Sequence, residues 1–139
     1  MPVFSTSISI LHANICLLLV RVTVGGIMLV HGIPKLNKLT AGGEIKFADP
    51  FGFGPQISLG LAVFAEVVCS IFIILGLGTR LAAIPLIITM AVAAFYAHAN
   101  DPFATKEKPI LLLIIFVMLM VFGSGRYSID RLMTKTNLQ

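Results

Sequence analysis

Four long apolar runs, separated by short polar stretches, dominate the pattern of hydrophobic and polar positions along the chain. Runs of roughly 20 apolar residues are long enough to cross the hydrocarbon core of a bilayer as helices. The fourth run is shorter, at roughly 14 residues, but Lys108 extends it because its charged head can reach the interface while its stem stays among apolar groups. The pattern predicts spans at about 13–32, 57–77, 81–99 and 110–122, and a short tail helix at about 128–135.

Glycine and proline mark the predicted ends of these spans. Gly32 followed by Pro34 indicates the end of the first span, and Pro109 fits the first helical position of the fourth. Only two or three residues join the second span to the third, so these two helices are expected to be antiparallel neighbours. The prediction is a single all-α domain over residues 1–139, an integral membrane four-helix up-down bundle with both termini on the same side.

Composition supports a membrane protein. Hydrophobic residues make up 58% of the chain and charged residues only 12%, and the mean hydropathy is +1.01; soluble domains carry roughly 25% charged residues. The net charge of +4 is spread over the loops and the tail, with no run rich in lysine and arginine. We therefore expect the lipid bilayer as a partner, with contact to anionic headgroups, and no nucleic acid.

Charge placement gives the expected orientation. Arg80 and Arg126 lie directly against span ends, where basic residues favour the cytoplasmic side most strongly, so the termini are expected in the cytoplasm. The loop at 33–56 then faces outward, with Phe51 and Phe53 at the membrane surface; a re-entrant segment is the alternative. A cleavable signal peptide is not expected, because the first apolar run is too long.

One carboxylate, Glu66, lies in the middle of the second apolar run, and one guanidinium, Arg21, lies inside the first. A charge at that depth costs about 2.5–3.5 kcal/mol on insertion scales. Counted from the predicted span ends, the two residues lie at depths that agree within one helical turn. We hypothesise that they pair, either as an interhelical clasp that sets the register or as a site that handles a proton or a ligand.

Further polar residues gather at the predicted outward ends of the first and third spans. His31, Lys35, His98 and Asp101 are expected to line a pocket there, with Glu66 below them. Hydrogen-bonded histidines at the interface are the alternative, and haem ligation is the least favoured. The candidates for ligand binding or proton handling are thus Arg21, His31, Lys35, Glu66, His98 and Asp101.

The two cysteines, Cys16 and Cys69, both lie in apolar runs. Neither belongs to a C-x-x-C or zinc-binding spacing, so we expect small buried hydrophobes and no metal site.

Three segments of the chain resemble the motifs of one family. These are Arg21–Gly26 with His31–Leu36, Glu66 with Leu75–Ala83, and Gly123–Asp130. In this order and spacing they are similar to the DoxX family over about residues 14–133; the serine at position 124, where proline is common, is a small departure. The matching positions that carry charge or a histidine are Arg21, His31, Lys35, Glu66, Arg126 and Asp130.

The resemblance implies a bacterial inner-membrane protein of four helices with links to redox tasks. A subunit of thiosulfate:quinone oxidoreductase is related to the family, and one branch is associated with oxidative-stress complexes. We therefore expect a small subunit of a membrane redox system that binds a quinone-like or other small molecule near Arg21, Glu66 and His98, with redox-protein partner subunits. Arg126 and Asp130 are expected to be structural.

Other functions remain open at this stage. A transporter-like or oligomeric pore protein and a non-catalytic assembly factor are the alternatives. No agreed catalytic mechanism comes with the family, so the sequence does not decide whether the chain is an enzyme, which residues are catalytic, or whether it forms a homo-oligomer.

Overall fold

The structure, a computed structural model, describes residues 6–136, and every regular element within them is a helix. The helices, in chain order, are α1 (Ile10–Thr40), α2 (Pro55–Val63), η1 (Phe64–Cys69), α3 (Ser70–Leu75), α4 (Thr79–Val92), η2 (Ala93–Ala97), α5 (Phe103–Phe122) and α6 (Ile129–Thr136). The segments η1 and η2 are π-helical, with one wider turn each. Because α2, η1 and α3 follow one another without a break, they form one long helix, and α4 continues into η2 in the same way.

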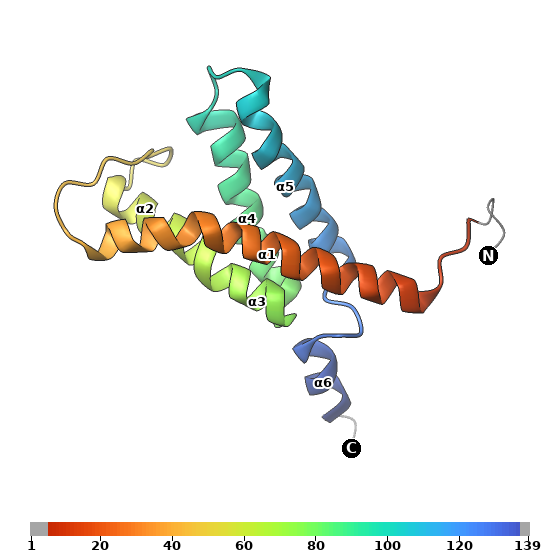
Figure 1. Ribbon diagram of the computed structural model, residues 1–139. Coiled ribbons are helices and arrows are strands. Elements are labelled where there is room, and N and C mark those ends of the chain that lie inside the picture. Colours follow the sequence, from red (N-terminus) through yellow and green to blue (C-terminus); the bar gives the residue numbers. More distant parts are fainter. Residues whose placement is uncertain (1–5, 137–139) are drawn as a thin grey trace.

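The long helices form two pairs (Figure 1). Helix α1 packs along α2, η1 and α3, and α4 with η2 packs along α5. The η1 segment also contacts α4 and so joins the two pairs, which are inclined to each other in Figure 1. The short α6 follows the loop after α5, and its first turn contacts the junction of α3 and α4.

The predicted boundaries of the second and third spans and of the tail helix lie within about two residues of the observed ones. The predicted end of the first span is wrong. Helix α1 continues through Gly32 and Pro34 to Thr40, because a proline inside a helix removes one backbone hydrogen bond while the bonds on either side of it remain. Helix α5 likewise begins before Pro109, at Phe103.

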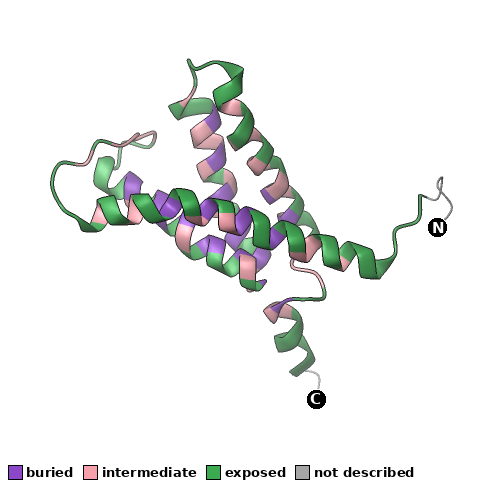
Figure 2. Ribbon diagram, viewed as in Figure 1, coloured by how far each residue is buried: buried purple, intermediate pink, exposed green. Residues whose placement is uncertain are grey.

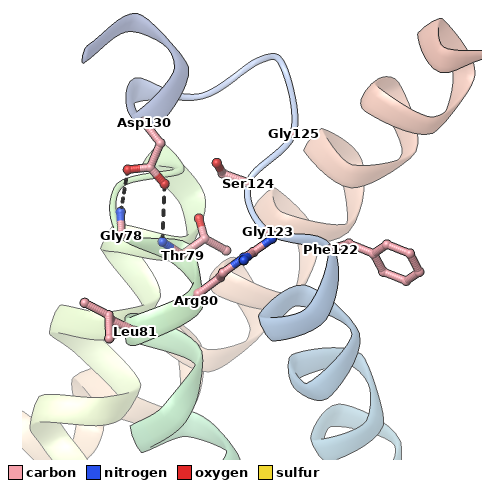
Figure 3. A pocket seen from close by; sticks show the side chains of 9 residues that line it. All are labelled: Gly78, Thr79, Arg80, Leu81, Phe122, Gly123, Ser124, Gly125 and Asp130. Atoms are coloured by element: carbon pink, nitrogen blue, oxygen red, sulfur yellow. Dashed lines mark hydrogen bonds between the residues drawn. The ribbon is translucent and has the colours of Figure 1, made fainter. Parts of the chain in front are cut away.

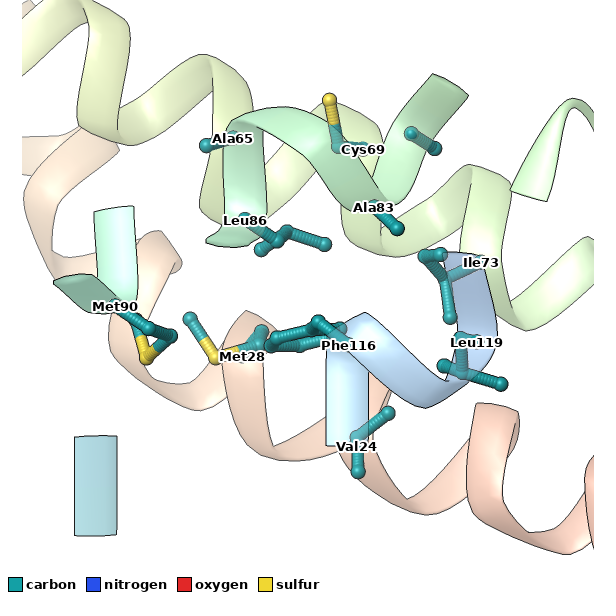
Figure 4. Close-up of a cluster of buried hydrophobic side chains, with 11 residues drawn as sticks. Val24, Met28, Ala65, Cys69, Ile73, Ala83, Leu86, Met90, Phe116 and Leu119 are labelled. Atoms are coloured by element: carbon teal, nitrogen blue, oxygen red, sulfur yellow. The ribbon is translucent and has the colours of Figure 1, made fainter. Parts of the chain in front are cut away.

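The core lies where the long helices face one another, and the outer surface is exposed (Figure 2). Met28 of α1, Leu86 of α4 and Phe116 of α5 meet in its centre (Figure 4). The exposed positions of the same helices are largely Leu, Ile, Val and Phe. An exposed surface of this composition is suited to contact with lipid tails.

Three of the continuous helices are long and apolar enough to cross a membrane: Ile10–Thr40, Pro55–Leu75 and Thr79–Ala97. In α5, Lys106, Glu107 and Lys108 lie in the first two turns, and the uncharged remainder begins at Pro109. The described chain is thus all-helical with three candidate spans.

Candidate functional site

An ion pair between Lys35 of α1 and Glu66 of η1 lies within the first helix pair. The Nζ of Lys35 donates to Oε1 of Glu66 at 2.6 Å. The Glu66 side chain is 2% exposed and that of Lys35 is 31% exposed. The carboxylate is therefore inside the protein, while the ammonium connects it to the surface.

Gly32 makes this pair possible. A Cβ at Gly32 would lie 2.8 Å from Cγ2 of Val67 and 2.9 Å from Cβ of Glu66, so any side chain there would collide with η1. The absence of a side chain lets the two helices approach closely, as small residues do in membrane proteins. Lys35 follows Gly32 by three residues and therefore lies on the same face of α1, next to Glu66.

The interior of this site has unused hydrogen-bonding capacity. Oε2 of Glu66 and Oγ of Ser70 are both buried and have no hydrogen-bond partner among the described residues. A buried polar atom without a partner costs about 1–3 kcal/mol. π-Helical turns such as η1 occur frequently at functional sites. The π-helical turn and the two unpartnered polar atoms make this region a candidate site for a ligand atom or a proton.

Phe47, from the loop between α1 and α2, covers part of the lysine. Nζ of Lys35 lies 5.8 Å from the centre of the Phe47 ring, within the range of a cation–π contact. An ammonium group has three N–H donors, and Glu66 accepts only one of them here. Lys35 can therefore donate to a further acceptor at the edge of the site.

The hypothesis that Arg21 pairs with Glu66 is wrong. The Arg21 guanidinium donates instead to three backbone carbonyls, those of Ser124, Tyr127 (2.8 Å) and Ile74 (3.3 Å). The depth comparison failed because it measured Arg21 from a helix end at Gly32. In the structure Gly32 itself lies level with Glu66, so Arg21 lies about 16 Å further along α1.

Arg21 instead connects α1 to the tail end of the molecule, which is formed by the end of α3, the start of α4 and residues 123–136. Arg21 is 1% exposed and lies against Gly76. Gly76 follows the last residue of α3 and has a left-handed backbone conformation, with a φ of +70°. A Cβ at Gly76 would lie 2.7 Å from Nη1 of Arg21 and 2.5 Å from Cβ of Ser128. Gly76 therefore provides both the left-handed turn and the space for the guanidinium.

Asp130 holds the start of α4. Its Oδ1 accepts from the Gly78 N–H at 2.8 Å and its Oδ2 from the Thr79 N–H at 3.5 Å (Figure 3), and its own N–H donates to the Gly76 carbonyl at 3.0 Å. A carboxylate in this position satisfies N–H groups that have no partner within the helix. The Arg126 N–H donates to Oδ1 of Asn14 at 2.7 Å. Both Asp130 and the Arg126 backbone thus have structural contacts.

Neither histidine is bonded to the Lys35–Glu66 pair in the part of the chain that the structure describes. Nδ1 of His98 lies 2.6 Å from Oδ2 of Asp101, and both side chains are exposed. His31 is exposed and forms no hydrogen bond or ion pair with any residue in 6–136. The structure therefore joins two pairs of the six candidates, Lys35 with Glu66 and His98 with Asp101. Whether any of them binds a ligand stays a prediction.

Cys69 is buried in the core, whereas Cys16 is exposed, so the expectation of burial is wrong for Cys16. The first turns of α1 extend beyond the other long helices in Figure 1, so side chains in that part of α1 have few neighbours to cover them. Over residues 6–136 no group of three or more histidine, cysteine, aspartate or glutamate side chains could hold a metal ion.

The role of Lys35 as the partner of Glu66 is the main feature that the sequence interpretation missed. A signal was present in α1. The buried residues of this helix recur at intervals of three and four residues, namely Arg21, Val24, Gly25, Met28 and Gly32. Continuing this stripe by three residues leads to Lys35, but the expected stop at Gly32 and Pro34 placed that residue in a loop.

Comparison with known proteins decides the family. The DoxX family model matches residues 16–99, which is more than half of the chain. The chain belongs to the DoxX family. Both residues of the ion pair lie within the matched region, whereas Asp130, which contacts the start of α4, lies beyond it.

Bacterial relatives of this DoxX protein agree with a membrane location. A Mycobacterium tuberculosis protein that is named an uncharacterised membrane protein is 30% identical over 84% of this chain and 80% of its own length. An uncharacterised protein of Haemophilus influenzae is 25% identical over 88% of this chain and 86% of its own. CatD of Bacillus subtilis, named as a proposed oxidoreductase, is 28% identical over 81% and 83%. No solved structure matches the chain significantly.

Proposed function

We propose that this DoxX protein is a small subunit of a membrane redox system and that Lys35 and Glu66 bind the head group of a quinone-like molecule. The observation that carries the proposal is the ion pair itself: a buried carboxylate with one unpartnered oxygen, joined at 2.6 Å to a partly exposed ammonium. Ionisable residues inside a membrane protein commonly mark functional sites. The name of the B. subtilis relative supports a redox role.

The chemistry of a quinone fits these two side chains. Its carbonyl oxygens accept hydrogen bonds, and its two-electron reduction to a quinol takes up two protons when a redox partner supplies the electrons. Lys35 has free N–H donors for a carbonyl oxygen, and Oε2 of Glu66 can hold a proton. The Phe47 ring beside Lys35 offers an apolar surface to the ring of such a ligand.

Binding of a short-chain quinone to the purified protein tests this proposal. Equilibrium dialysis followed by the absorbance of the quinone suits this chain, which contains no tryptophan for fluorescence. We expect Lys35→Met and Glu66→Gln to weaken binding about ten-fold or more. Lys35→Met removes the charged donor, and Glu66→Gln replaces the carboxylate that holds Lys35 with a neutral amide. Lys38→Met is the matched control, since Lys38 is an exposed lysine on the same helix that donates to the Lys46 carbonyl. Equal binding by all variants would refute the site.

The alternative functions predict different results in the same preparation. Flux into proteoliposomes that depends on the protein, without quinone binding, would favour a transporter or pore. Neither flux nor binding, together with a partner protein that copurifies at fixed stoichiometry, would favour an assembly factor. Either result would contradict the redox proposal.

We further propose the finer topology: a four-helix up-down bundle in the bacterial inner membrane, with α5 as the fourth span and both termini in the cytoplasm. The uncharged part of α5 begins at Pro109. Lys108, just before it, can lengthen the apolar span, because its aliphatic stem can lie among lipid tails while its ammonium group reaches the interface. Arg80 and Arg126 lie at span ends on the terminal side, which supports its cytoplasmic location.

Reporter fusions test this topology. A reporter fused after Gln139 is expected to be active only as a cytoplasmic reporter, and one inserted at Lys46 only as a periplasmic one. If α5 does not cross the membrane, the two fusions will report the same side, and the four-span topology is refuted. Opposite sides in reversed order would keep the four spans and reverse the orientation.

A further inference from the structure

A hollow opens at the tail end of the molecule, between the start of α4 and the end of α5 (Figure 3). Its volume is about 390 Å³, which is within the range of small-molecule sites. The lining residues that matter here are Thr79, Arg80, Leu81, Phe122, Gly123 and Ser124. Glu66 and Lys35 do not line it, so it is separate from the site of the proposed redox function.

Two hydrogen-bond donors in this hollow lack an acceptor. The guanidinium of Arg80 reaches across to the end of α5, where a Cβ at Gly123 would lie 3.2 Å from its Nε. It forms no hydrogen bond or ion pair within residues 6–136. The hydroxyl of Thr79 is buried, has no partner in the same range, and points toward Ser124 in Figure 3. A guanidinium and a hydroxyl side by side are suited to the oxygens of a phosphate group.

The charge around the hollow favours an anion. Asp130 is the acidic residue of its lining, and both of its oxygens already accept N–H groups at the start of α4. The basic residues at this end of the described chain outnumber it: Arg21, Arg80, Arg126, Arg131 and Lys135. An excess of positive charge around a concave surface raises the local concentration of anions.

The edges of the hollow are apolar. Leu81 and Phe122 are 75% and 63% exposed and flank the hollow from opposite sides (Figure 3). In the nearby α6, Leu132 and Met133 are exposed next to each other, while Arg131 and Lys135 supply its charge. An amphipathic helix of this kind lies in the plane of the membrane interface. A hollow beside such a helix is suited to a phospholipid headgroup.

We propose that this hollow binds the phosphodiester group of an anionic phospholipid. Arg80 and Thr79 donate to the phosphate oxygens, and the acyl chains lie over Leu81 and Phe122. The apolar edges distinguish this ligand from free phosphate, which has no apolar part to cover them. The bound lipid would join the start of α4 to the end of α5 and so stabilise the second helix pair.

Thermal unfolding of the delipidated protein in detergent tests the proposal, with phosphatidylglycerol, phosphatidylcholine of the same chains, or inorganic phosphate added. We expect phosphatidylglycerol to raise the unfolding midpoint saturably, and native mass spectrometry to show one retained lipid. Arg80→Gln is expected to weaken this binding about five-fold or more. Thr79→Val should weaken it too, while keeping the backbone N–H that contacts Asp130. Lys135→Gln removes the same charge at the same end but outside the lining, and should weaken binding much less than Arg80→Gln.

Four results would overturn the proposal. Unchanged lipid binding by both Arg80→Gln and Thr79→Val would remove the site. Equal weakening by Arg80→Gln and Lys135→Gln would show a diffuse charge effect instead. Equal stabilisation by phosphatidylcholine would exclude selection of an anionic headgroup, and equal stabilisation by inorganic phosphate would identify free phosphate as the ligand. The midpoints without lipid show whether each variant is folded, and quinone binding at Lys35 is measured independently of all these outcomes.

Discussion

Gly32 of α1 lies directly against Glu66 of η1, with space for no side chain between them. A Cβ at Gly32 would lie 2.9 Å from Cβ of Glu66 and 3.0 Å from its carbonyl carbon. This close approach brings Lys35, one helical turn further along α1, to 2.6 Å from the buried carboxylate. A helix–helix contact in the apolar part of the protein is thereby combined with a charge pair that the proposed redox function uses.

The Gly32 contact can be tested by adding one methyl group. We expect Gly32→Ala to lower the free energy of unfolding by about 1–3 kcal/mol, because the methyl group would overlap with Val67 and Glu66. Gly26→Ala is the control on the same helix, since a Cβ there meets nothing within 4 Å. Its stability should be unchanged or higher by up to about 1 kcal/mol, from helix propensity alone. Equal losses in unfolding measurements in detergent would contradict the close contact.

A double-mutant cycle distinguishes the two candidate partners of Glu66. Lys35→Met and Glu66→Gln should be coupled by about 0.5–3 kcal/mol, because their side chains are in contact. Arg21→Met and Glu66→Gln should add within about 0.5 kcal/mol, because the two residues have separate partners. Unfolding free energies of the single and double variants provide the measurement. Coupling of Arg21 and not of Lys35 would refute the observed pairing.

The contacts of Arg21 require a guanidinium. Arg21→Lys should lower the free energy of unfolding by about 1.5–3 kcal/mol or more, because a compact ammonium cannot reach the carbonyls of Ser124, Tyr127 and Ile74 together. Arg126→Lys is the control, because the side chain of Arg126 has no partner among the described residues, and its effect should stay within about 0.5 kcal/mol. A tolerated Arg21→Lys variant would show that the three carbonyl contacts contribute little.

The contact of Asp130 with the start of α4 gives a separate prediction. Asp130→Ala should cost about 0.5–2 kcal/mol, because the N–H groups of Gly78 and Thr79 lose their acceptor. Asp130→Asn keeps one carbonyl acceptor for Gly78 and should lose less. Chemical denaturation of the three proteins gives the order, and an asparagine variant less stable than the alanine variant would contradict the cap.

Acid stability depends in part on Asp49, in the loop before α2. The hydrogen bond from the Ser58 hydroxyl, together with backbone N–H donors that include Gly54, lowers the pKa of the Asp49 carboxyl. A group whose pKa is lower in the folded state stabilises the protein above its unfolded pKa of about 3.9, and this contribution is lost as the pH falls through the folded value. Asp49→Asn should therefore reduce the loss of stability on acidification below about pH 4.

A control for this acid dependence lies in the same loop. Glu44 is exposed and accepts no hydrogen bond within residues 6–136, so Glu44→Gln should leave the pH profile of the unfolding midpoint unchanged. A profile altered equally by Glu44→Gln and Asp49→Asn would show that general loop charge, not the contact with Ser58, is responsible.

Local patterns in the sequence were sufficient for the helical class and for several element boundaries. The second and third long helices and α6 lie within about two residues of their predicted positions, because apolar runs bounded by Gly76, Gly78 and Ser128 depend on local chemistry alone. The family resemblance is likewise confirmed. These features follow from residue type and spacing along one segment, which a sequence contains directly.

The partner of Glu66 depended on the tertiary structure. The sequence shows a buried carboxylate that needs a positive charge, and it offers Arg21 and Lys35. Which of them lies beside Glu66 is set by the register between α1 and η1, and that register is set by Gly32, where only a glycine allows the helices to touch. The sequence around Gly32 is equally compatible with the end of a helix and with a close contact between two helices. Only the neighbouring helix distinguishes the two roles, because the atoms that would collide with a side chain belong to residues more than thirty positions away.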